Sequence, residues 1–163
     1  MNNNLNIPFY DKEEILEFAL KNNMISNTLS NEKIYDNFLS LDVSKEAIIN
    51  QTKVIKEIAN KGNAVIIGRS ADYILQENKN LIKVFIYAPM DYKIKNVMQN
   101  YNDNEKQAKN NILKSNEARL NYYSFVANKV WGDKDNYDLC INAKIGNENV
   151  VKIILDYIEN NKV

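Results

Sequence analysis

A glycine and an arginine at the end of an apolar run form the pattern in this sequence best suited to binding an anion. Gly68-Arg69 directly follows the run 64–67, which is typical of a parallel strand buried on both faces. Ligands of such sheets bind beyond the carboxyl ends of the strands. Glycine lets the backbone approach a ligand closely, and the planar fork of arginine matches phosphate oxygens. The pattern predicts an anion site, and the alternative that Arg69 merely starts a helix and pairs with Asp72 stays open.

A second group of chemically capable residues lies in a long stretch with helical character. Basic, polar and aromatic side chains share the segments 114–123 and 128–133. Such a region could be a mobile lid that closes over a phosphate. The alternative is a solvated helix whose tyrosines pack on the core, and residue types alone favour this alternative.

Composition excludes several classes of function. The sequence contains no histidine, which removes the commonest general base and metal ligand. Its 21 basic and 21 acidic side chains cancel, so no large field favours nucleic acid or a membrane surface as a partner. The single cysteine, Cys140, lies in the apolar run 137–142, which predicts an inert, buried side chain. With no apolar stretch of membrane-spanning length, we expect a cytoplasmic protein.

Glycine-rich phosphate cradles are absent from the sequence. The segment 62–70 only approximates the phosphate-loop pattern G-x-x-x-x-G-K-[ST], because it has one residue too many, arginine in place of lysine, and apolar residues where exposed amides are needed. Gly132 and Gly146 stand alone. We therefore interpret 62–70 as a strand with its two ends.

Strands and helices alternate along the chain. We expect strands at 7–10, 64–67, 83–88 and 138–142, and helices from 12 to about 20, then at 44–61, from near 70, 89–100, 105–130 and 147–159. We expect a loop at 22–32, and on helix 44–61 an inward stripe of Ile48, Thr52, Ile55, Ile58 and Ala59. This alternation predicts an α/β fold with a mostly parallel sheet in one domain, 1–163.

Four collinear segments together resemble the bacterial cytidylate kinase-like family. They are 7–13, 65–75, 84–89, and Trp131-Gly132-Asp133 with 137–142. The resemblance implies a three-layer P-loop kinase fold that uses ATP with Mg²⁺, a nucleoside monophosphate (typically CMP) as acceptor, and a lid, here about 103–132. It implies no metal ligand among these residues.

The resemblance also implies roles for particular side chains. Arg69 would hold the acceptor monophosphate by a bidentate contact. Arg119 matches a lid arginine that neutralises charge on the transferring phosphoryl group, with Lys129 assisting. The residues assigned to the acceptor nucleotide are Tyr10, Asp11, Gly68, Arg69 and Asp72.

The sequence departs from the family pattern at several phosphate-handling positions. Asn116 and Glu117 stand where an Asp-Lys pair is common, and Lys93 and Asn96 stand where arginines are common. The strand, glycine-rich loop and helix that usually come first are missing. Phosphoryl transfer depends on the positioning and charge neutralisation that the loop supplies. We therefore expect this chain to be inactive, with a pseudokinase that binds a nucleotide or a protein as the alternative.

The missing segment has a structural consequence. In this fold, the strand of the loop lies between those matching 64–67 and 83–88, so its loss predicts two unpaired inner edges. We expect a truncated reading frame or a fragment, or a sheet closed differently, by direct pairing or by a second chain.

Overall fold

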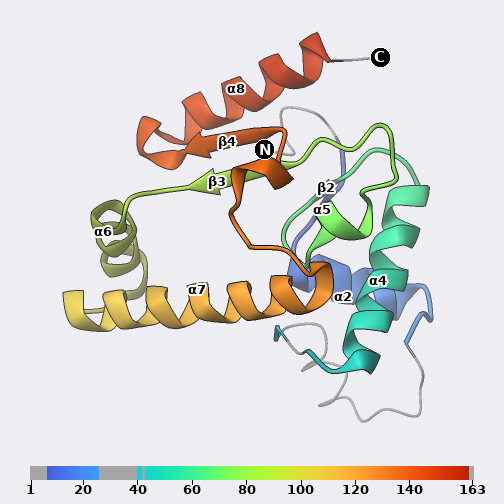
Figure 1. Cartoon of the computed structure of the whole chain (residues 1–163), viewed down its shortest axis with the longest axis horizontal. Coiled ribbons are helices and arrows are strands. Elements are labelled where there is room, and N and C mark those ends of the chain that lie inside the picture. Colours follow the sequence, from blue (N-terminus) through green and yellow to red (C-terminus); the bar gives the residue numbers. More distant parts are fainter. Residues whose placement is uncertain (1–6, 26–39, 42, 162–163) are drawn as a thin grey trace. The chain divides into compact units, whose positions relative to one another are not determined.

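The computed structural model describes residues 7–25, 40–41 and 43–161. Two compact units make up the chain, one of residues 1–81 with 120–131 and the other of residues 82–119 with 132–163 (Figure 1). The loop expected at 22–32 lies largely outside the described residues.

The first unit contains a short parallel pair of strands and three helices of its own. Strand β1 (Phe9–Tyr10) pairs with β2 (Val65–Ile66), with Phe9 opposite Val65 and Tyr10 opposite Ile66. The helices are α2 (Lys12–Lys21), α4 (Lys45–Asn60) and α5 (Ala71–Ile74), and the end of α7 (Glu105–Ala127) also belongs to this unit. These elements bring the strand end at Ile66, and the Gly68-Arg69 segment after it, next to helices from distant parts of the sequence.

Helix α4 supplies much of the core of the first unit, through a face that overlaps only in part with the one expected. Its buried residues are Ala47, Gln51, Val54, Ile55 and Ile58. The stripe expected from the sequence was partly wrong, because Ile48, Thr52 and Ala59 are only half-buried. The observed buried residues are spaced along one helical face. A polar residue, Gln51, lies at the centre of that face, so hydrophobicity alone did not identify it. Residues of α2 complete the core: Ile15, Leu16 and Ala19.

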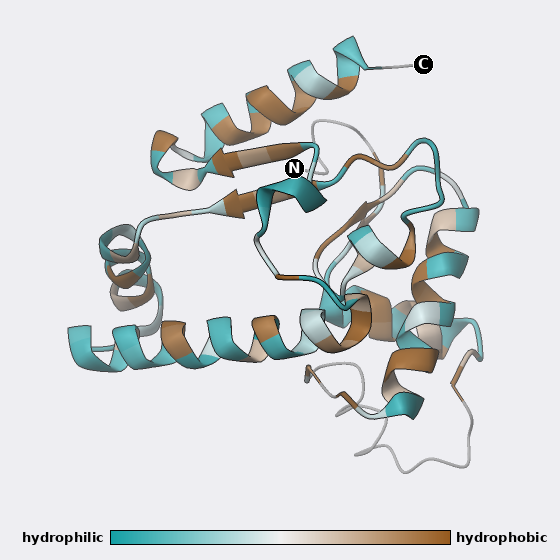
Figure 2. Ribbon diagram, in the orientation of Figure 1, coloured by the Kyte–Doolittle hydropathy of each residue, from teal (hydrophilic) through white to brown (hydrophobic). Residues whose placement is uncertain are grey.

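The second unit pairs its two strands in parallel and covers them with a helix on one side. Strand β3 (Val84–Tyr87) runs beside β4 (Leu139–Asn142), in register from Val84 opposite Leu139 to Tyr87 opposite Asn142. The helix is α8 (Asn147–Asn160), whose Val150 and Ile154 pack against Ile141. Both strands are strongly hydrophobic (Figure 2). The unit also contains α6 (Met90–Tyr101), the first part of α7, and the 3₁₀ turns η1 (Lys134–Asn136) and η2 (Ala143–Ile145).

The expectation that Cys140 is buried was wrong, because its side chain is exposed. Successive residues of a strand point to opposite faces. Ile141 is only 5% exposed beneath α8, whereas Cys140 points to the other side of the sheet. The expected burial of the run 64–67 on both faces was also wrong, because Val65 and Ile66 are only half-buried and Ile67 is 52% exposed. On β3, Ile86 and Tyr87 are likewise exposed.

The order of strands and helices and the parallel pairing confirm the α/β class. The strands form two separate sheets of two strands each, ordered β1-β2 and β3-β4. Among the described residues, each of these strands has one partner strand. The three-layer kinase-like arrangement stays a prediction. No described helix is long and apolar enough to cross a lipid bilayer.

Candidate functional site

The turn that carries Arg69 has an unusual backbone. Gly68, Arg69 and Ser70 have φ angles of +75°, +57° and +53°. A left-handed conformation costs a residue with a side chain about 1–2 kcal/mol, and glycine avoids this cost. The turn closes through a hydrogen bond of 3.1 Å from the amide of Ala71 to the carbonyl of Gly68, after which α5 begins. Backbone strain of this kind persists only where surrounding contacts hold it, and it often accompanies a functional site.

Arg69 is largely enclosed by the first unit. Its side chain is 7% exposed, and Nη1 donates a hydrogen bond to the carbonyl oxygen of Ser40. Burial lowers the pKa of the guanidinium, and the nearby acidic groups of Tyr122 and Glu13 oppose this shift. An arginine retains its charge in proteins even so. The structure therefore provides a positive charge held inside the unit, directly after strand β2.

Asp72 makes a different contact from the ion pair with Arg69 that the sequence left open. Its Oδ2 accepts a hydrogen bond of 2.6 Å from the hydroxyl of Tyr123, and the tyrosine side chain is buried. The neighbouring Tyr122 donates a hydrogen bond of 2.9 Å to Oε1 of Gln51 on α4. The end of α7 is thus joined to α4 by a buried hydrogen bond and to α5 by a partly buried one.

These two tyrosines were not recognised as site residues from the sequence. The sequence favoured a packing role for the tyrosines of this helix, and burial of Tyr122 and Tyr123 confirms packing. What the residue types did not show was their hydroxyl partners. The one available signal was Gln51, because a polar side chain amid an apolar helical face needs a buried partner.

Ser70 is buried beside Arg69 in the same turn. Its side chain is 4% exposed, and Oγ has no hydrogen-bond partner among the described residues. An unsatisfied buried hydroxyl costs about 1–3 kcal/mol. The turn therefore combines backbone strain, a buried charge and an unsatisfied polar atom.

Tyr10 and Asp11, both assigned to the acceptor site, make structural contacts here. Asp11 Oδ1 accepts hydrogen bonds of 2.8 Å and 3.4 Å from the amides of Glu13 and Glu14, which caps α2. A side-chain hydrogen bond with Glu14, together with these amides, lowers the pKa of Asp11. The ring of Tyr10 packs edge-on against Phe18, with 5.8 Å between centroids. A ligand role for either residue stays a prediction.

Arg119 and Lys129 are both exposed and belong to different units. Arg119 is the last residue of its segment in the second unit, and its Nη1 lies 3.4 Å from Oδ1 of Asn116 on the same helix. Lys129 follows Asn128, whose φ of +51° accompanies the end of α7. The structure therefore brings Gly68, Arg69 and Asp72 together in one unit, and the two assignments to phosphoryl transfer stay predictions.

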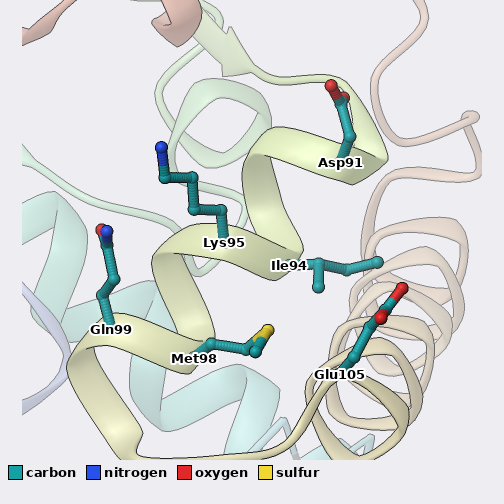
Figure 3. A pocket seen from close by; sticks show the side chains of 6 residues that line it. All are labelled: Asp91, Ile94, Lys95, Met98, Gln99 and Glu105. Carbon is teal, nitrogen blue, oxygen red and sulfur yellow. The ribbon is translucent and has the colours of Figure 1, made fainter.

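Two surface hollows lie apart from these assigned residues. The larger, of about 550 Å³, lies in the second unit between α6 and the start of α7. Figure 3 shows Ile94 and Met98 of α6 pointing toward Glu105 of α7, while Lys95 and Gln99 point away. The smaller, of about 350 Å³, lies in the first unit and is lined by α4 and α5 together with Glu77 and Asn78. Neither is lined by a residue assigned to the site, so we place the candidate site at Arg69 on chemical grounds.

The described residues do not provide the groups that normally bind ATP with Mg²⁺. A nucleoside triphosphate is normally held by consecutive backbone amides of a glycine-rich loop with a lysine and a hydroxyl for the metal. The sequence has four glycines, and no two are adjacent. Gly68 is followed by Arg69, which donates to a backbone carbonyl. The donor set at Arg69 suits a single phosphate group better, because one guanidinium can bind two of its oxygens.

Comparison with known proteins agrees with the resemblance seen in the sequence. A family model described as the cytidylate kinase-like family matches residues 1–145. A crystal structure described as an uncharacterized protein from Eubacterium ventriosum ATCC 27560 is similar, with 31% sequence identity and a TM-score of 0.79 over 98% of this chain and 88% of that chain. No curated protein matched the sequence. The match over residues 1–145 shows that the chain belongs to the cytidylate kinase-like family.

Proposed function

We propose that the chain binds a nucleoside monophosphate, CMP by family resemblance, through the guanidinium of Arg69, and that these 163 residues alone do not transfer phosphate from ATP. Membership of the family suggests a monophosphate acceptor and ATP with Mg²⁺ as donor. The observation that carries the proposal is the buried Arg69 held in a strained turn directly after strand β2.

Arg69 suits the acceptor phosphate because of its chemistry and its surroundings. A guanidinium binds a phosphate group through two parallel hydrogen bonds, and a site shielded from water strengthens each of them. In this structure Nη1 donates to the carbonyl of Ser40. A phosphate dianion is a much stronger acceptor than a neutral carbonyl, so binding would exchange this contact for charge-assisted ones.

The proposal of inactivity rests on the donor half of the reaction. Transfer of a phosphoryl group needs positioning and charge neutralisation of the γ-phosphate. The sequence supplies no glycine-rich cradle, and the described residues include no cluster of three or more acidic or cysteine side chains that could hold a metal. Arg119 and Lys129 would neutralise charge during transfer in a chain that has a donor site.

A second candidate is a pseudokinase module that binds a nucleotide or a protein without catalysis. The presence of an acceptor-type arginine without a triphosphate cradle favours it. We also propose that a strand from another polypeptide segment completes the sheets. Two-stranded sheets are marginal by themselves, and β2 and β3 each have one partner strand among the described residues.

Thermal unfolding of the full chain with added nucleotide tests the proposed acceptor site. A ligand that binds only the folded state raises its stability by mass action, by about 2.7 kcal/mol at a concentration of 100 times Kd. We expect CMP to raise the unfolding temperature and ATP with Mg²⁺ to leave it unchanged. A coupled assay for ADP should show no CMP-dependent turnover. Robust turnover would contradict inactivity, and the absence of a shift with CMP would contradict the proposed acceptor site.

A further inference from the structure

A hydrogen bond between α7 and α5 lies beside the strained turn. The hydroxyl of Tyr123 donates to Oδ2 of Asp72 at 2.6 Å, across 51 residues of sequence. Tyr123 is 4% exposed and Asp72 is half-buried, so water has limited access to this bond. A bond from a phenol to a carboxylate is charge-assisted, which makes it stronger than a bond between neutral groups.

Asp72 lies three residues after Arg69 in the sequence, next to the turn that carries it. It occupies the first turn of α5, directly after Ala71, which is itself buried in the core of the unit. The amides of Tyr73 and Ile74 both donate to the carbonyl of Ser70, at 3.0 Å and 2.9 Å, so Asp72 is held in one short turn with Ser70. Any movement of Asp72 is therefore transmitted to the left-handed residues before it.

A strained backbone needs support on both sides. On one side the guanidinium of Arg69 donates to the carbonyl of Ser40. On the other side Asp72 accepts the hydroxyl of Tyr123. If a phosphate draws Arg69 away from Ser40, the contact at Asp72 remains to keep the turn left-handed.

We propose that Tyr123, acting through Asp72, is a positioning residue for Arg69, so that the end of α7 sets the pose of the anion-binding side chain. This inference rests on the proposed acceptor function of Arg69. Tyr123 need not touch the ligand. Its hydroxyl holds α5 at the angle that keeps Gly68, Arg69 and Ser70 in their left-handed conformation.

The neighbouring tyrosine does not have the same connection. The hydroxyl of Tyr122 donates to Gln51 in the middle of α4 and not to α5, although Tyr122 lies near enough to Arg69 to oppose the lowering of the guanidinium pKa. Adjacent residues of a helix point in directions about 100° apart, so the two hydroxyls reach different elements. The proposal therefore concerns Tyr123 alone.

The test compares two variants of the full chain that lose similar stability. Tyr123→Phe removes the hydroxyl that Asp72 accepts. Ile55→Val removes one methylene carbon from a side chain that is 0% exposed on α4, which costs about as much as one lost hydrogen bond. CMP affinity is measured by calorimetry well below the unfolding temperature, so that both variants are folded. We expect Tyr123→Phe to weaken CMP binding about tenfold and Ile55→Val to change it less than twofold.

A second readout follows Arg69 without any ligand. The sequence has two arginines, Arg69 and Arg119, so a ¹⁵N spectrum should contain two Nε–H signals, which Arg119→Lys would assign. We expect Tyr123→Phe to move the Arg69 signal and speed its exchange with water, while Ile55→Val does neither. Asp72→Asn keeps a side-chain oxygen that can accept the Tyr123 hydroxyl, so it should keep the signal near its wild-type position.

These experiments distinguish failure of the positioning role of Tyr123 from failure of the acceptor function of Arg69. Failure of wild-type chain to bind CMP or inorganic phosphate would overturn the acceptor site, whereas the Arg69 signal would still report on positioning. An unmoved Arg69 signal in Tyr123→Phe would overturn the positioning role. Equal loss of affinity in Ile55→Val would overturn it as well, because general destabilisation would then explain the effect.

Discussion

The hydroxyl of Tyr122 donates a hydrogen bond of 2.9 Å to Oε1 of Gln51, a residue 71 positions earlier in the chain. Both side chains are almost completely buried, with exposed fractions of 3% and 1%. The contact fastens the end of α7 to the centre of the apolar face of α4. It explains how a polar residue is tolerated in the core of the first unit, and it makes the two side chains energetically dependent on each other.

This dependence predicts non-additive losses of stability. Tyr122→Phe leaves the amide oxygen of Gln51 without this donor and should cost about 1–3 kcal/mol of unfolding free energy. Gln51→Met should cost a similar amount, because it leaves the phenol without its acceptor. In the double variant both polar groups are gone, so we expect a cost about 1 kcal/mol smaller than the sum. Urea denaturation measures all four proteins, and additive costs would show that the bond contributes little.

Substitution of Ser70 is expected to raise the stability of the protein. Because its buried Oγ has no partner among the described residues, Ser70→Ala removes an unsatisfied hydroxyl without changing the Cβ in the left-handed turn. We expect the free energy of unfolding to rise by about 1 kcal/mol. Ser124→Ala, on an exposed position of α7, is the matched control and should change stability by less than about 0.5 kcal/mol. A loss of stability in Ser70→Ala would mean that the hydroxyl has a partner.

Gly132 is constrained by both its backbone and its neighbour in the second unit. Its φ is +82°, and a Cβ built there would lie 3.0 Å from Cζ of Phe85. Phe85 has little freedom to move, because its ring stacks on Tyr137 with 4.9 Å between centroids. Gly132→Ala should therefore cost about 2 kcal/mol or more. In a Phe85→Leu background the same substitution should cost less, and an unchanged cost would assign the whole effect to the backbone.

Asp11 links stability to pH through its cap on α2. Its folded-state pKa is lowered, mainly by the hydrogen bond with Glu14 and by the backbone amides, relative to an unfolded value of about 3.9. The lowered pKa of Asp11 contributes stability above about pH 4 through the amides that bind its carboxylate, and this contribution is lost as pH falls through the folded value. The raised pKa of Glu14 acts in the opposite direction, because its contribution is lost as pH rises. Asp11→Ala should cost about 1 kcal/mol at pH 7. The difference from wild type should shrink below pH 4 in urea melts, and a constant difference would contradict the cap.

The sequence predicted the element order well because each signal was local. Helices were expected from 12 and from 44, and the side chains of Asp11 and Ser44 cap the helices observed there. The parallel strands were correctly located because apolar, β-branched runs favour extended strands whatever their partners, although the expected burial of those strands was wrong. Gly68-Arg69 was correctly placed after a strand for the same reason.

What the sequence did not reveal depends on contacts between distant segments. The expected burial of Cys140 was wrong. The residue types of 137–142 indicate a strand, but they do not indicate which face of that strand a helix covers. The contact of Asp72 with Tyr123 spans 51 residues and leaves no periodic signal. The same is true of Tyr122 with Gln51. Polar pairs in a core become visible only when the chain segments that carry them are placed together.

Calorimetric titration of CMP into the full chain and into Arg69→Lys tests the central claim most directly. Lysine keeps the charge but loses the planar fork, so we predict binding by the wild type and affinity at least tenfold lower in Arg69→Lys. Lys152→Met, which removes an exposed cation paired with Asp156 on α8, should bind CMP as the wild type does. Equal CMP affinity in wild type and Arg69→Lys would contradict the assignment of the monophosphate site to Arg69.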